Sequence, residues 1–154
     1  MLRNGSPERE KLINHWAGKI LEKLGQVLPD KPTEAELRRA VEPLLEQFCQ
    51  EVGLNPLVRA EYTLADGRAD TIFNRLVIEF KAPGVLKKSP DKATQSAIGQ
   101  VEGYVQDLAR KHRHEVSRLA GVVFDGRFLV FGRFAHKKWV AESPVEVNQH
   151  SLEK

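Results

Sequence analysis

Three residues of the chain have the types and spacing to do chemistry: Asp70, Glu79 and Lys81. They belong to two short segments rich in β-branched and apolar residues, 67–73 and 76–80, which are predicted to be strands joined by a tight turn. Side chains alternate faces along a strand, so Glu79 and Lys81 are expected on one face. Two carboxylates at these positions could bind a divalent cation, and the amine could take part in proton transfer.

The turn at Asn74-Arg75 predicts which residues of the two strands face each other. With a two-residue turn, the antiparallel pairs are Phe73 with Leu76, Ile72 with Val77, Thr71 with Ile78, and Asp70 with Glu79. Directly opposed Cβ atoms lie about 5 Å apart, and like charges there are destabilising unless something positive lies between them. A divalent cation between Asp70 and Glu79 meets that requirement.

At these residues the chain resembles the PD-(D/E)XK nuclease superfamily. The resemblance lies in Ala69-Asp70, in Glu79-Phe80-Lys81, and in Gln100-Val-Glu-Gly-Tyr104, which is similar to the Q-x-x-x-Y element of some members. Ala69 stands where the name-giving proline would be. An ordinary ion-pair face on a solvated strand also fits Glu-x-Lys, so the order of the surrounding elements decides between the two interpretations.

The predicted elements follow the order of that superfamily. Hydrophobic periodicity and capping residues predict helices at 7–28, 33–53 and 93–112, and strands at 58–64, 67–73, 76–80, 119–124 and 127–131. A short strand is expected at 139–140, and the tail from Glu142 onward is expected to fray. Without the first helix the order is similar to the αβββαβ core of the nucleases, over residues 33–131. We therefore expect a mixed α+β, restriction-endonuclease-like domain at 33–154 and an N-terminal helical extension at 1–32.

Two further segments resemble the nuclease domains at the N-termini of restriction-modification enzymes. Thr33-Glu34 together with Pro43-Leu44-Leu45 is similar to their first helix, in which an acid often completes the site. Gly121-Val-Val-Phe-Asp-Gly126 is similar to the strand and Asp-Gly turn that follow their Q-x-x-x-Y helix. The resemblance thus predicts a magnesium-dependent endonuclease domain of a restriction-modification or related DNA-defence system.

The resemblance implies a role for each candidate residue. Asp70 and Glu79 would hold Mg²⁺, or Mn²⁺ in its place, with the backbone carbonyl of Phe80 as a third ligand. Lys81 would position or deprotonate the attacking water, or stabilise developing charge. Glu34 would reach the metal directly or through water, although an acid in the first turn of a helix also stabilises the helix dipole.

Other polar residues are candidates for holding DNA. Gln100 and Tyr104 form an i, i+4 pair that could orient Lys81 or hold a phosphate, or could simply flank the core with the tyrosine packed on the sheet. Contacts to the DNA backbone are expected from Lys87, Lys88, Lys92, Arg110, Lys111 and Arg113.

Composition restricts the other possibilities. A length of 154 residues suits one domain, and the formal charge of +3 permits nucleic-acid binding without demanding it. One cysteine excludes an internal disulfide framework, and the chain has no apolar run long enough to span a bilayer. We expect the protein to be cytoplasmic, to bind DNA and not to associate with a membrane. Further expected partners are a methyltransferase, specificity or helicase module, or a second copy of the chain.

Two other classes of function stay open from the sequence. One is a catalytically inactive nucleic-acid-binding or regulatory module of the same fold. The other is a protein-interaction domain that docks through its first helix, whose apolar stripe includes Trp16.

Overall fold

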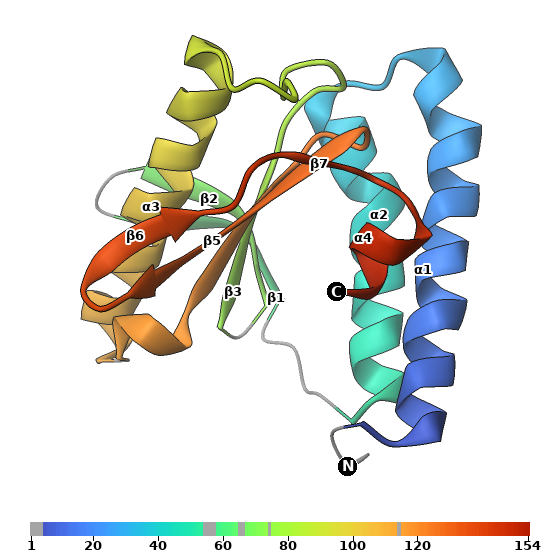
Figure 1. Ribbon diagram of the computed structural model, residues 1–154, viewed down its shortest axis with the longest axis horizontal. Coiled ribbons are helices and arrows are strands. Elements are labelled where there is room, and N and C mark those ends of the chain that lie inside the picture. Colours follow the sequence, from blue (N-terminus) through green and yellow to red (C-terminus); the bar gives the residue numbers. More distant parts are fainter. Residues whose placement is uncertain (1–4, 54–57, 65–66, 74, 114) are drawn as a thin grey trace.

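Two layers of helices enclose a mixed sheet in this protein (Figure 1). The computed structural model describes residues 5–53, 58–64, 67–73, 75–113 and 115–154, and for 58–64 and 67–73 it describes the backbone alone. The first half contains α1 (Pro7–Val27), η1 (Leu28–Asp30), α2 (Glu34–Glu51), β1 (Val58–Leu64), β2 (Gly67–Phe73) and β3 (Leu76–Phe80). The second half contains α3 (Lys92–His112), η2 (Val116–Arg118), β4 (Ala120–Phe124), β5 (Phe128–Ala135), β6 (Lys138–Ala141), β7 (Val145–Glu146) and α4 (Gln149–Glu153). The predicted mixture of helices and strands is confirmed.

Local capping chemistry explains where the long helices begin. Ser6 caps α1 by accepting a hydrogen bond from the backbone N–H of Arg9, and Pro7 occupies the first helical position. Thr33 and Glu36 form a reciprocal capping box at the start of α2. Both starts agree with the sequence-based prediction.

The sheet runs in the order β1-β2-β3-β4-β5-β6, with β7 paired to β5. Neighbouring strands are antiparallel except β3 and β4, which are parallel and joined through α3. The predicted hairpin register is confirmed for the three pairs that the structure describes: Phe73 with Leu76, Ile72 with Val77, and Thr71 with Ile78. Asp70 and Glu79 would be the next pair in this register.

Alternation along β3 divides its side chains between two cores. Val77 packs with α3, where Val101 and Val105 cover the sheet. Ile78 and Phe80 pack in the opposite core, which α1 and α2 cover. Glu79 and Lys81 therefore lie on the face covered by α3.

Helix α1 contributes to the core that contains Ile78 and Phe80. Trp16 is 3% exposed, and its indole Nε1 donates a hydrogen bond to Glu51 Oε2 at 2.9 Å, which joins α1 to the end of α2. Ile20 and Leu24 are buried against Leu37 and Val41 of α2. Trp16, Ile20 and Leu24 of the apolar stripe thus pack within the chain itself. No helix among the described residues is long and apolar enough to cross a membrane.

The expectation that the chain frays from Glu142 onward is wrong. Val145 pairs with Leu129 of β5, and Asn148 caps α4 by accepting from the backbone N–H of Ser151. Leu152 then packs in the core between the sheet and α1. A two-residue strand and a five-residue helix are too short to show hydrophobic periodicity, so long-range packing rather than local pattern stabilises them. Likewise β5 and β6 are longer than expected.

Candidate active site at the end of the parallel strands

Glu79 and Lys81 form an ion pair where β3 ends. Glu79 is 4% exposed, and its Oε1 accepts a hydrogen bond from Lys81 Nζ at 3.0 Å. The backbone N–H of Lys81 donates to the carbonyl oxygen of Phe124 at 2.9 Å, so the pairing with β4 continues one residue past the strand. The lysine side chain is 18% exposed. The predicted shared face is confirmed, and the pair combines a buried carboxylate with an amine that reaches solvent.

The second predicted carboxylate, Asp70, lies in β2 one residue beyond the pair of Thr71 with Ile78. Its side chain lies outside the described part of the chain, so the opposition of Asp70 and Glu79 remains a prediction. Among the described side chains, no three His, Cys, Asp or Glu residues gather as a metal site would need. The predicted ligand set includes Asp70 and therefore remains a prediction.

The loop after Lys81 is tied to the sheet by Asp125, which sequence reasoning placed only in a turn. Asp125 is fully buried, and its Oδ2 accepts hydrogen bonds from the backbone N–H groups of Gly84 at 3.2 Å and Leu86 at 2.9 Å. Its Oδ1 accepts from the N–H groups of Arg127 at 2.9 Å and Phe128 at 2.8 Å. One carboxylate thus fixes both the β4–β5 turn and the start of the loop that leaves the candidate site.

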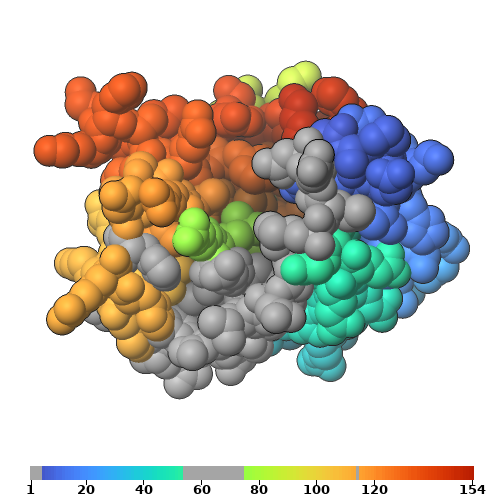
Figure 2. All heavy atoms as spheres, turned by 90° about the horizontal axis from the view of Figure 1, so that it is seen from below, coloured from blue at the N-terminus to red at the C-terminus, as the bar shows by residue number. Residues whose placement is uncertain are grey.

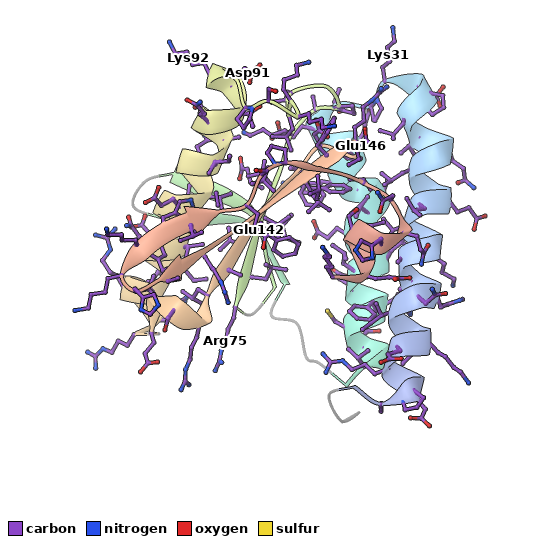
Figure 3. All side chains as sticks on the ribbon, viewed as in Figure 1. Lys31, Arg75, Asp91, Lys92, Glu142 and Glu146 are labelled. Carbon is purple, nitrogen blue, oxygen red and sulfur yellow. The ribbon has the colours of Figure 1, made fainter. Side chains whose placement is uncertain are left out.

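Thr94 and Asp91 hold the other end of that loop. Thr94 is fully buried and accepts a hydrogen bond from the backbone N–H of Lys87 at 3.1 Å. Asp91 caps α3 by accepting at Oδ1 from the backbone N–H of Thr94 at 2.9 Å and from its hydroxyl at 2.8 Å. These hydrogen bonds lower the pKa of Asp91, the backbone one most. The loop is therefore ordered at both ends, with Asp91 and Lys92 at the upper end of α3 (Figure 3).

The lowered pKa of Asp91 predicts a pH-dependent helix cap. A carboxyl whose pKa falls on folding contributes stability above its unfolded pKa, about 3.9, and loses that contribution as the pH falls through the folded value. We expect the thermal midpoint of Asp91→Ala to lie below that of the wild type at pH 6, with the gap narrowing toward pH 3. Asp91→Asn, which keeps a capping oxygen without titrating, is the matched control and should lose less at pH 6. A gap for Asp91→Ala that is constant with pH would contradict the assignment.

Glu34 lies in the first turn of α2, near the end of the sheet at which β3 ends. Leu37, one turn later, packs against the β4–β5 turn, since a Cβ at Gly126 would lie 3.3 Å from Leu37 Cδ1. Helix α2 covers the face of Ile78 and Phe80, however, whereas Glu79 projects from the other face. Glu34 could therefore approach Glu79 only around the ends of the strands.

The predicted pair on α3 separates into a buried and an exposed residue. Tyr104 is 5% exposed and belongs to the core that contains Val77. Gln100 is exposed and makes no hydrogen bond within the described part of the chain. The structure thus supports the packing interpretation for Tyr104, and leaves Gln100 accessible to a ligand.

The six basic residues predicted to contact DNA fall into two groups. Lys87, Lys88 and Lys92 are exposed on the loop and first turn of α3, on the side of the molecule where β3 ends. Arg110, Lys111 and Arg113 are exposed at the last turn of α3. A helix of 21 residues is about 30 Å long, so the two groups lie at opposite ends of the domain. The predicted DNA contacts would therefore come from two separate surfaces.

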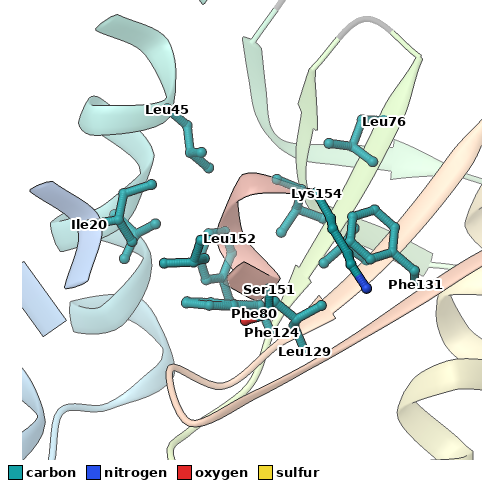
Figure 4. A pocket seen from close by; sticks show the side chains of 13 residues that line it. Ile20, Leu45, Leu76, Phe80, Phe124, Leu129, Phe131, Ser151, Leu152 and Lys154 are labelled. Atoms are coloured by element: carbon teal, nitrogen blue, oxygen red, sulfur yellow. The ribbon is translucent and has the colours of Figure 1, made fainter. Parts of the chain in front are cut away.

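A cavity of about 190 Å³ lies on the other face of the sheet (Figure 4). Its wall is almost entirely apolar and comes from α1, α2, the sheet and α4, with Ile20 on one side, Phe131 on the other and Leu152 between them. Phe80 lines it while Glu79 does not, because successive side chains of β3 point to opposite faces. This cavity is therefore separate from the candidate active site.

Comparisons with known proteins supply no relative for this chain. No protein-family model matches it. No curated protein and no solved structure matches it either. Its function is therefore inferred from its own residues and their geometry.

Proposed function

We propose that this protein is a metal-dependent deoxyribonuclease with a restriction-endonuclease-like core. The observation that carries the proposal is the Glu79–Lys81 ion pair at the end of β3, next to a hairpin whose register continues to Asp70. The order α2-β1-β2-β3-α3-β4 supports it, because it is the order of the αβββαβ core that the sequence resembles. The parallel pairing of β3 with β4 brings the end of β3 beside the β4–β5 turn.

The donor set suits a hard divalent cation. A carboxylate as buried as Glu79 needs positive charge or hydrogen bonds against it, and Lys81 supplies one of each. Carboxylate and carbonyl oxygens are the ligands that Mg²⁺ prefers, so Glu79, Asp70 and the Phe80 carbonyl would hold it, with Glu34 as an outer candidate. The bound ion would supply charge neutralisation on the phosphoryl oxygens.

The other residues of the proposed site have distinct tasks. Lys81 Nζ, hydrogen-bonded to Glu79 and open to solvent, can orient the attacking water or stabilise developing negative charge as an ammonium. To accept the proton of the water it would first have to release its own proton to solvent. Lys87 and Lys88 lie in the loop before α3 and Lys92 lies in its first turn, and these three lysines would hold the backbone of the DNA being cut. Gln100 remains a candidate for a phosphate contact. A methyltransferase, specificity or helicase module, or a second copy, would supply sequence recognition in a DNA-defence system.

Asp70→Asn tests the metal site. If Asp70 and Glu79 face each other, removing one of two like charges should raise the thermal midpoint of the protein in chelator and abolish cleavage. Magnesium should raise the midpoint of the wild type by mass action and do much less for the variant. Scanning calorimetry with magnesium and with chelator, beside a cleavage assay on linear and supercoiled DNA, measures both effects.

The exposed Asp30→Asn is the matched control, which should change neither midpoint nor cleavage. A wild type indifferent to magnesium, or Asp70→Asn less stable than the wild type in chelator, would contradict the metal site. Binding of DNA without cleavage in magnesium or manganese would instead favour the inactive nucleic-acid-binding module.

A further inference from the structure

A strongly basic surface lies at the end of the sheet opposite the candidate active site. This basic end consists of Arg75, residues 110–113 and 115–118, and residues 133–138. The backbone N–H of Ala120 donates to the carbonyl oxygen of Arg75 at 3.1 Å, and Ala120 pairs with Arg133. Viewed from this end, the start of β3 lies beside the segments that end α3 and form η2, with the β5–β6 hairpin next to them (Figure 2).

Charge is concentrated at the basic end. It contains eight of the 24 Lys and Arg residues but one of the 21 Asp and Glu residues, Glu115. The rest of the chain therefore carries 16 basic and 20 acidic residues, so the positive net charge of the whole protein comes from this end. The net charge of +3 for the whole chain therefore does not show how unevenly the charges are distributed.

Two ion pairs at the basic end join described residues of neighbouring helical turns. Arg118 pairs with Glu115 at 3.2 Å, but both side chains are mostly exposed, which makes such a pair weak. Arg110 contacts the buried Asp107. Arg75 and Arg133 are exposed and make no ion pair within the described part of the chain.

Three basic residues of this end also occupy backbone conformations that disfavour them. Arg113 ends α3 at φ 52°, a position at which glycine is usual. His136 and Lys137 form the two-residue turn between β5 and β6 at φ 50° and 65°, which Asn-Gly would fill with less strain. At Arg113 and Lys137 positive charge thus stands where folding alone would favour glycine or asparagine, and such conflicts concentrate at functional positions.

We propose that the basic end binds the phosphate backbone of duplex DNA, as a surface separate from the site of cleavage. Arginine predominates over lysine here, and its planar guanidinium suits phosphate oxygens. A membrane is a poorer partner, because the exposed large apolar side chains in the described part of the chain are two valines, Val140 and Val145. The inference does not rest on the nuclease proposal, since binding here needs neither metal nor the Glu79–Lys81 pair.

A variant that relieves strain while removing charge provides the test. In the triple variant Arg113→Gly, His136→Asn, Lys137→Gly, thermal stability should be retained or raised, since each new residue suits a positive φ. Affinity for duplex DNA of about 30 base pairs, measured in chelator by fluorescence anisotropy, should fall about tenfold or more near 0.1 M salt. The slope of log affinity against log salt should flatten by up to about two units, for two lost phosphate contacts.

Lys31→Gly is a closely matched control. Lys31 is also an exposed lysine with positive φ, 48°, but it lies at the opposite end of the molecule from Arg75 (Figure 3). The Lys31→Gly variant should therefore bind duplex DNA with the affinity and the salt slope of the wild type. Equal DNA binding by the triple variant and the wild type would overturn the proposal, as would an equal loss in Lys31→Gly. Tighter binding of the wild type to anionic phospholipid vesicles than to DNA would also overturn it.

Discussion

Lys81→Ala is expected to lower metal-dependent DNA cleavage by at least about a hundredfold, the usual contribution of a positioned proton-transfer group. The reason is geometric: Lys81 Nζ is held 3.0 Å from Glu79 Oε1 at the point where the chain leaves β3. Single-turnover cleavage at saturating magnesium measures the loss. Lys31→Ala, which removes an exposed lysine with no role in the proposed site, is the matched control and should retain most of the rate.

The same substitution should also reduce stability, for a reason that can be separated from catalysis. Lys81→Ala removes the amine that pairs with the buried carboxylate of Glu79, and breaking a buried pair on one side costs about 3 kcal/mol. Glu79→Gln in the same protein removes the buried charge and should recover much of the lost stability without restoring cleavage. Wild-type cleavage in Lys81→Ala would refute the role of the lysine, and equal stability of the single and double variants would refute the coupling.

Asp125→Ala should strongly destabilise the β4–β5 turn and the loop that follows Lys81. Four backbone N–H groups lose their acceptor, two in the β4–β5 turn and two in the loop that follows Lys81. An unsatisfied buried donor costs about 1–3 kcal/mol. Only the hydrogen bond from Leu86 is buried and the other three are partly buried, so a combined loss of about 3 kcal/mol is expected. Urea unfolding measures it, and hydrogen exchange should show lost protection at Gly84 and Leu86.

Asp125→Asn separates hydrogen bonding from side-chain volume. An amide offers one accepting oxygen, and its NH₂ group would face two of the four donors, so an intermediate loss is expected. Asp30→Ala, at an exposed aspartate, controls for the general loss of a carboxylate and should be near neutral. A change below about 1 kcal/mol for Asp125→Ala would mean that solvent or neighbouring groups satisfy the four N–H groups.

Features that depend on neighbours along the chain are predictable from the sequence. The caps at Ser6 and Thr33 involve residues three positions apart, and the hairpin register follows from the length of one turn. The face shared by Glu79 and Lys81 follows from the alternation of a single strand. Such interactions are local, so the residue types alone carry the information.

Contacts between distant segments are decided by tertiary packing. Asp125 bonds to Gly84 and Leu86 across some forty positions, and no local pattern indicates that an Asp-Gly turn will reach that loop. Arg75 joins the basic end because parallel pairing brings it beside Ala120, while the length of α3 carries Lys92 to the far side. The residue types of both basic groups are visible in the sequence, but their separation is set by the geometry of one helix and one crossover.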